Sequence, residues 1–128
     1  MPRKSKDRRP PIAIGHVMFE ARDVAAAAEW FETVGLRPIA GGDDFAVLEL
    51  RGGTHLIVTQ MKRRPKRGAA APFDLMVDDV DAARRGFMAK GLAPSRIHRG
   101  SIHDSFELPG PEGARFTVQS SHAGRRPV

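Results

Sequence analysis

Histidine and carboxylate side chains are the groups in this sequence that could do chemistry, and several of them fall in stretches with the alternation of a β-strand. His16 and Glu20 lie in one such stretch, and His103 and Glu107 lie in another. Imidazoles and carboxylates can hold a divalent metal, and a histidine can act as a general base near neutral pH. Because the chain has no cysteine, disulfides, thiolate zinc sites and cysteine nucleophiles are excluded.

Strand alternation predicts which of these groups share a face. Every second side chain of a strand points to the same side, so His16, Met18 and Glu20 form one face of the stretch from 12 to 21. The same argument gives polar faces to three later strands, with the members Asp74 and Met76, then His103, Ser105 and Glu107, then Arg115, Thr117 and Gln119. These four faces are the candidates for a binding site.

Other residues have simpler interpretations. We expect His55 at the rim of a sheet, near the start of a strand, and Trp30, Phe31 and Phe87 in the core. The run His103-Asp104-Ser105 resembles a catalytic triad in composition alone, because adjacent strand residues point to opposite faces. We therefore predict no nucleophilic serine at this position.

The elements that position these faces occur twice, at a constant offset of 56 residues. Each copy has a strand, an aspartate that can cap a helix, an apolar helical stripe and a glycine that can end the helix. The residues that match are Asp23, Val24, Ala26, Ala27, Phe31, Gly35, Leu36 and Pro38 in the first copy, and Asp79, Val80, Ala82, Ala83, Phe87, Gly91, Leu92 and Pro94 in the second. Such a duplication predicts two units of similar structure.

The first unit reads as a strand, a helix and two or three further strands, and the second as a strand, a helix and three further strands. At 128 residues the chain is the size of one ordinary domain, so the two units must share a core. The predicted organisation is a basic disordered tail at 1–11, a single domain at 12–120 made of module one (12–60), a linker (61–71) and module two (72–120), and a C-terminal tail at 121–128.

The net charge of +6 is concentrated in the predicted tails and linker. Residues 1–10 carry five basic side chains and one acidic one, residues 61–68 carry five basic ones, and the rest of the domain has a net negative charge. A basic protein can bind nucleic acid. Since no aromatic residue is interleaved with these charges, we expect no nucleic-acid partner, with weak, salt-sensitive binding through the tail as the alternative.

No apolar run approaches the roughly 18 to 20 residues that a membrane span needs. The N-terminus is basic, but no apolar stretch follows it as in a secretory signal. Together with the absence of cysteine, these features predict a cytoplasmic protein without a membrane partner.

Three segments carry a family resemblance: residues 16–24 with Trp30-Phe31 and Val34-Gly35-Leu36 behind them, residues 77–83, and residues 109–118. In this order they resemble the vicinal oxygen chelate superfamily, which includes glyoxalases, bleomycin-resistance proteins, fosfomycin-modifying enzymes and extradiol dioxygenases. The resemblance implies an α+β fold in which two tandem βαβββ modules form a curved, cup-shaped mixed sheet with helices outside. It also implies a homodimer that builds grooves between subunits.

Active members of that superfamily hold a divalent metal, with one ligand near each of four strands. Carried over onto this sequence, the first ligand position falls on His16. The others fall on Pro72, on Thr117, and on Ile57 or, with a shift of one residue, Val58. Proline, isoleucine and valine donate nothing to a metal, and threonine is a poor ligand. We therefore expect no cofactor, with a divalent metal as the alternative.

These considerations predict a glyoxalase-like or bleomycin-resistance-like protein that binds a small organic molecule in the cup without a metal. One alternative is a lyase, isomerase or dioxygenase whose rearranged metal site draws on His16, Glu20, Asp74, His103 and Glu107. A second alternative is a metal-free enzyme with His16 or His103 as general base. A third is that several of these side chains lie near the rim of the cup and merely face solvent. The sequence does not decide whether the protein is an enzyme. The predicted cup residues are His16, Met18, Glu20, Asp74, Met76, His103, Ser105 and Thr117.

Overall fold

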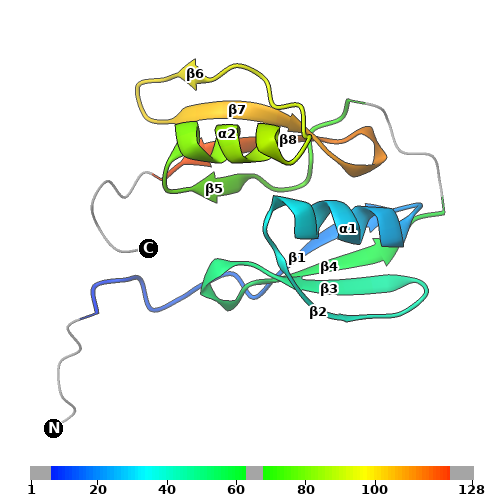
Figure 1. Ribbon diagram of the computed structural model, residues 1–128. Coiled ribbons are helices and arrows are strands. Elements are labelled where there is room, and N and C mark those ends of the chain that lie inside the picture. The colour runs from blue at the N-terminus through cyan, green and yellow to red at the C-terminus, as the bar shows by residue number, and fades with distance from the viewer. Residues whose placement is uncertain (1–6, 63–67, 122–128) are drawn as a thin grey trace, which may run out of the picture.

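The computed structural model describes residues 7–62 and 68–121, which form two modules of similar structure (Figure 1). The start of the predicted basic tail (1–6), the centre of the linker (63–67) and most of the C-terminal tail (122–128) lie outside the described residues. The elements of module one are β1 (His16–Ala21), α1 (Val24–Val34), β2 (Arg37–Gly41), β3 (Phe45–Glu49), the 3-10 turn η1 (Arg51–Gly53) and β4 (His55–Gln60). Those of module two are β5 (Leu75–Val77), α2 (Val80–Ala89), β6 (His98–Arg99), β7 (Asp104–Pro109), the 3-10 turn η2 (Pro111–Gly113) and β8 (Arg115–Ser120).

Both modules have the same sheet topology. The strand order is β1-β4-β3-β2 in the first sheet and β5-β8-β7-β6 in the second. In the first sheet β1 pairs in parallel with β4, and in the second β5 pairs in parallel with β8. All other neighbouring strands pair antiparallel. The predicted α+β fold of two tandem βαβββ modules is confirmed, with two separate four-stranded mixed sheets that do not close into a barrel. Among the described helices, none is long and apolar enough to cross a membrane.

The two helices begin and end where the repeat predicts. The carboxylates of Asp23 and Asp79 each accept a hydrogen bond of 3.0 Å from the backbone N–H three residues further on. After α1, Gly35 has a φ of 125° and the N–H of Leu36 donates to the carbonyl of Phe31. A left-handed glycine and the equivalent bond also end α2. These caps use local contacts, which is why the sequence alone reveals them.

Module one has three strands after α1, because β2 forms in addition to β3 and β4. Its side chains are all exposed, and it forms the edge of the first sheet. The strand contains Pro38, and its pairing with β3 shifts register between Pro38 and Ala40. Proline cannot donate a ladder hydrogen bond, so edge strands and bulges are the positions where it is tolerated.

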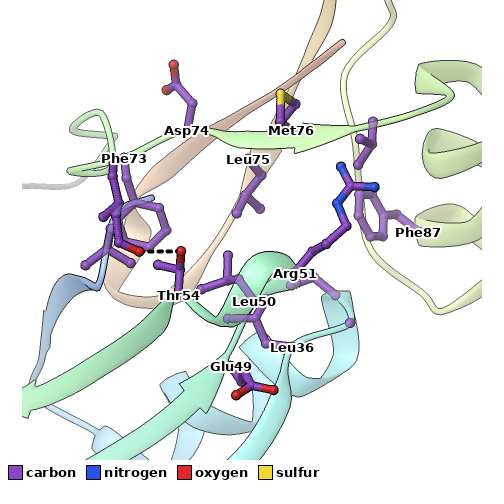
Figure 2. A pocket seen from close by; sticks show the side chains of 15 residues that line it. Leu36, Glu49, Leu50, Arg51, Thr54, Phe73, Asp74, Leu75, Met76 and Phe87 are labelled. Carbon is purple, nitrogen blue, oxygen red and sulfur yellow. Dashed lines mark hydrogen bonds between the residues drawn. The ribbon is translucent and has the colours of Figure 1, made fainter. Parts of the chain in front are cut away.

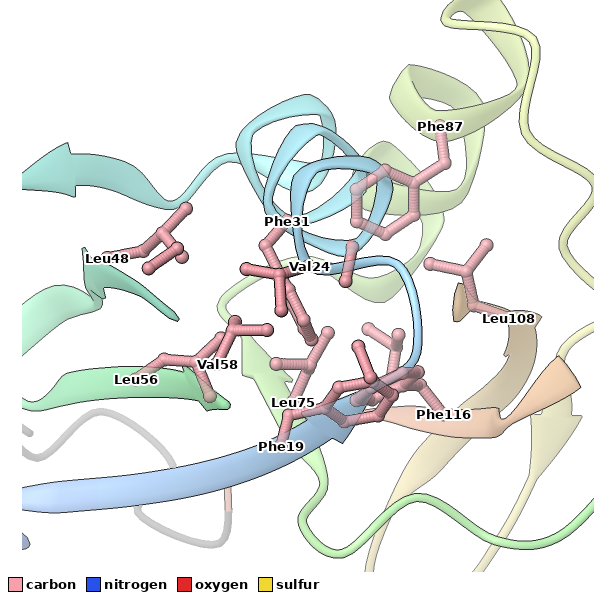
Figure 3. Packing of buried hydrophobic residues seen from close by; sticks show 14 of the residues in the cluster. Phe19, Val24, Phe31, Leu48, Leu56, Val58, Leu75, Phe87, Leu108 and Phe116 are labelled. Carbon is pink, nitrogen blue, oxygen red and sulfur yellow. The ribbon is translucent and has the colours of Figure 1, made fainter. Parts of the chain in front are cut away.

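One hydrophobic core joins the two modules (Figure 3). Phe116 of β8 is fully buried and packs against three rings of module one, with ring centroids 5.0 Å from Trp30, 5.6 Å from Phe31 and 5.8 Å from Phe19. Phe73, just before β5, completes the group at 5.5 Å from Phe116. The prediction that Trp30 and Phe31 belong to the core is confirmed, and the two modules share that core as the chain length requires.

A carboxylate from module two also holds the start of α1. Glu112 of η2 accepts hydrogen bonds from the backbone N–H groups of Arg22, at 2.7 Å, and Asp23, at 3.0 Å. Glu112 has a φ of 61°, a left-handed conformation that is uncommon for a residue with a side chain. Its place next to Gly113 in a tight turn aims the carboxylate at module one, so the turn fixes the two modules relative to each other.

Candidate functional site

The first group of predicted cup residues lies on the open face of the first sheet. His16, Met18 and Glu20 alternate with buried Phe19 and Ala21, and all three are exposed. This confirms the predicted alternation of the strand. The parallel register places them beside the face residues of β4, in the pairs His16 with His55, Met18 with Ile57 and Glu20 with Thr59.

A row of polar side chains crosses this face at its N-terminal end. The rings of His16 and His55 are stacked, with centroids 6.0 Å apart and an interplanar angle of 27°. The Nε2 atom of His55 lies 3.1 Å from a carboxylate oxygen of Glu49, and Glu49 also pairs with Arg37. Sequence reasoning placed His55 at the start of a strand, where it is, but missed its neighbour His16, because alternation within a strand says nothing of the register between strands.

The second group lies on the open face of the second sheet. Asp74 and Met76 are exposed, while His103, Ser105 and Thr117 are half-buried. Glu107 links this face by contacts to the hydroxyl of Thr117, at 3.3 Å, and the Nε of Arg115, at 3.4 Å. Asp74 also contacts Gln119 at 3.4 Å, and His103 Nδ1 lies 2.7 Å from the Ser120 carbonyl oxygen.

The two groups point away from the core that joins the modules. Phe19 lies on the opposite side of β1 from His16 and Met18, and Phe116 lies on the opposite side of β8 from Thr117. Since Phe19 and Phe116 stack on each other, the faces without cup residues are the ones that meet. Within one chain, the described structure therefore holds the eight predicted residues as two groups, one on each sheet.

A cavity of about 550 Å³ lies between the modules, at the C-terminal end of α1 (Figure 2). Its walls are mainly apolar, and both modules contribute to them. Figure 2 shows Leu75 of β5 directed toward Leu50 and Thr54, whereas Asp74 points to the other side of the strand. The lining residues are Ile14, Val17, Val34, Gly35, Leu36, Glu49, Leu50, Arg51, Thr54, Phe73, Asp74, Leu75, Met76, Val77 and Phe87.

An ion pair between the modules borders this cavity. Nη1 of Arg51, in η1, donates to both carboxylate oxygens of Asp78, at 3.0 and 2.9 Å. Asp78 follows β5, so the pair joins the hairpin tip of module one to module two. Of the predicted cup residues, Asp74 and Met76 border the cavity, although the Asp74 side chain points away from it (Figure 2). Its other walls were missed, because the cavity forms where two modules meet and no motif within either one marks it.

The residues at the four carried-over ligand positions do not fit the divalent metal that active members of the similar superfamily hold. Ile57 is the neighbour of Met18 on the open face, Pro72 precedes β5 and is exposed, and Thr117 contacts Glu107. His16 is thus the one good ligand among the carried-over positions. In the part of the chain that the structure describes, no three His, Asp or Glu side chains are grouped so that they could hold a metal ion.

No protein-family model and no curated protein matches the sequence. Solved structures do match: the lactoylglutathione lyase of Agrobacterium tumefaciens has a TM-score of 0.71 at 20% identity, over 89% of this chain and 97% of that one. A glyoxalase/bleomycin resistance protein/dioxygenase from Nocardioides has a TM-score of 0.70 at 18% identity, over 94% and 89% of the two chains. The bleomycin-binding protein of Streptomyces verticillus has a TM-score of 0.66 at 18% identity, over 88% and 99%.

These likenesses extend over nearly the whole of both chains in each comparison. The protein therefore has the vicinal oxygen chelate fold, the fold of the glyoxalase, bleomycin-resistance and dioxygenase proteins. The predicted fold is thereby confirmed. At these identities the likeness establishes the architecture, and the function has to be argued from the residues of this chain.

Proposed function

We propose that this protein binds a small organic molecule, in the cavity between its modules, without a metal ion. The observation that carries the proposal is the cavity itself, whose volume of about 550 Å³ lies within the range of small-molecule sites and whose walls are mainly apolar. The bleomycin-binding protein of Streptomyces verticillus, which was solved with copper(II)-bleomycin, supports small-molecule binding by a chain of this fold.

Metal independence is the second part of the proposal. It is supported by the poor donor set at the carried-over ligand positions, where His16 stands with proline, isoleucine and threonine. The rearranged set predicted as an alternative is divided between the sheets, with His16 and Glu20 on one and the other members on the second. A lyase, isomerase or dioxygenase would need these groups to converge on one ion, and within one chain they do not. Only the paired faces of a dimer would bring them together, and the metal content of the purified protein decides between the two.

The test compares the protein before and after treatment with a chelator. We expect native mass spectrometry of the purified protein to show a retained small molecule, metal content far below one ion per chain, and unchanged ligand retention after dialysis against EDTA. A stoichiometric content of zinc, nickel, manganese or iron, together with loss of the ligand after EDTA, would instead favour the metal-dependent enzyme. A protein that carries no ligand and binds no member of a broad panel would contradict the proposal as a whole.

The eight predicted cup residues enter this proposal through a homodimer. A second copy of the chain could set the open face of its module two against that of module one, so that the two groups enclose one cup. Met18 and Met76, on these faces, are 50% and 48% exposed, and exposed large apolar side chains of this kind are frequent at interfaces between subunits. A cytoplasmic location also remains part of the proposal.

The dimer is tested by light scattering coupled to size-exclusion chromatography. We expect twice the mass of one chain for the wild type and a shift to the monomer for Met18→Glu, because a buried unpaired carboxylate destabilises an apolar interface. The matched control is Met88→Glu, at an exposed position of α2 away from both open faces. Equal masses for the two variants would refute the placement of the interface.

A further inference from the structure

We propose that the cavity between the modules selects a ligand with an apolar body and one carboxylate group, and that Arg51 binds this carboxylate. The inference rests on the proposed function, since it names the class of molecule that the same cavity takes. Three observations support it: the position of the Arg51 side chain, the N–H groups of its guanidinium that make no hydrogen bond to the described residues, and the charges around it.

The backbone conformation of η1 fixes the position of the Arg51 Cα atom, from which the side chain extends. Leu50 and Thr54 close the hairpin with a hydrogen bond of 2.8 Å, and the turn between them contains Gly52 and Gly53, with φ angles of 83° and 87°. Such positive angles favour glycine, so two successive glycines permit this tight tip. Figure 2 shows the Arg51 side chain extending from this tip toward β5.

The guanidinium of Arg51 has one edge that the described residues do not use. Both of its bonds to Asp78 come from Nη1, and within residues 7–62 and 68–121 neither Nε nor Nη2 donates a hydrogen bond. Arginine presents its N–H groups as a planar fork, and the Nε and Nη2 pair matches the two oxygens of a carboxylate. Arg51 can therefore keep its link to Asp78 and bind a ligand carboxylate at the same time.

Two other charged residues border the cavity, Glu49 and Asp74, and neither competes with Arg51 for a ligand inside it. The carboxylate of Glu49 already pairs with Arg37 and His55. Asp74 lies on the opposite side of its strand from Leu75, the residue that points into the cavity (Figure 2). An acid with an apolar body would thus place its carboxylate at the Arg51 fork and its body against Leu36, Leu50 and Phe73.

The same geometry disfavours neutral and cationic ligands. A neutral amide accepts a hydrogen bond from arginine, but without the charge assistance that roughly doubles the strength of the contact. An ammonium group would lie next to the guanidinium, where like charges repel. The Asp78 carboxylate offsets part of the Arg51 charge from outside, and its side chain is 75% exposed, so solvent screens that effect.

The experiment measures by calorimetry how tightly the full chain binds three probes of nearly equal shape: 2-naphthylacetate, 2-naphthylacetamide and 2-naphthylethylammonium. We expect the acid to bind about tenfold more tightly than the amide, and the ammonium to bind most weakly. Arg51→Gln should remove the preference for the acid over the amide. Arg51→Lys should keep part of it, because lysine keeps the charge without the planar fork.

Two controls separate ligand binding from the link between the modules. Asp78→Asn removes the partner of Arg51 but keeps the guanidinium, so the preference for the acid should persist. Arg96→Gln removes an exposed positive charge elsewhere in module two and should bind the probes as the wild type does. Arg51 is itself half-exposed, so its variants should fold, and thermal melting checks this.

The outcomes distinguish this inference from the proposed function. Equal affinities for the acid and the amide, or an acid preference that survives Arg51→Gln, would overturn the assignment of a carboxylate to Arg51 while leaving small-molecule binding intact. Failure of every probe to bind would overturn the assignment to Arg51, and small-molecule binding would fall with it only if the wild-type protein also carried no ligand and bound no member of the broad panel.

Discussion

Replacement of Phe116 by alanine should lower the free energy of unfolding by about 3–5 kcal/mol, the cost typical of removing a fully buried ring. The side chain is completely buried, and its ring lies 5.0 to 5.8 Å from the rings of Trp30, Phe31, Phe19 and Phe73. Alanine would leave a void that is lined by these rings, three of which belong to the other module. Such a loss is a large part of the stability of an ordinary small domain.

Urea unfolding followed by the fluorescence of Trp30, the single tryptophan, measures this change. The matched control is Phe45→Ala, because Phe45 is 39% exposed at the start of β3, and its loss should have a much smaller effect. Since both modules contribute to one core, wild-type unfolding should be a single transition. Two separate transitions, with Phe116→Ala affecting one of them, would show that the modules are independent.

Replacement of Leu50 by tryptophan should weaken the binding of 2-naphthylacetate by more than about tenfold, because the larger ring occupies space that the ligand needs. Leu50 lies between β3 and η1 and lines the cavity beside Leu36 and Arg51. The Arg51 fork stays in place in this variant. The loss would therefore show that the apolar body of the ligand lies in the cavity, independently of its charge.

Calorimetry with the same probe measures the change, and Ile39→Trp is the matched control. Ile39 is 49% exposed on the edge strand β2 and does not line the cavity, so its replacement should leave the affinity unchanged. Leu36→Trp, at the end of α1, should reproduce the effect of Leu50→Trp from a second wall. Tight binding by both cavity variants, with unchanged melting temperatures, would place the ligand elsewhere.

Local features of the fold could be predicted because their causes lie within a few residues of chain. Asp23 and Asp79 cap helices through contacts three residues away, and Gly35 ends α1 by its own backbone conformation. The alternation of β1 likewise follows from strand geometry, so the exposed face of His16, Met18 and Glu20 was predicted. Strand β2 was left open, since its fully exposed side chains and its proline give no alternating pattern.

The contacts at the candidate site and between the modules were harder to predict, because they join distant segments. The stacking of His16 on His55 follows from the parallel register of β1 and β4, and the bond from Arg51 to Asp78 joins two modules. Glu112 reaches α1 from a turn ninety positions away in sequence, and nothing around it in the chain distinguishes it from a surface carboxylate.

The sequence by itself determined the duplication of a strand–helix–strands unit and the alternation of its strands, and the resemblance added that three of the four carried-over metal positions hold poor ligands. The duplication and the alternation follow from residue type and local spacing. The tertiary structure decided that the faces opposite His16 and Thr117 pack together, that the predicted cup residues form two groups in one chain, and that a cavity with Arg51 at its border lies between the modules. The physical reason is that core packing selects one relative placement of the two sheets, and local spacing carries no information about that choice.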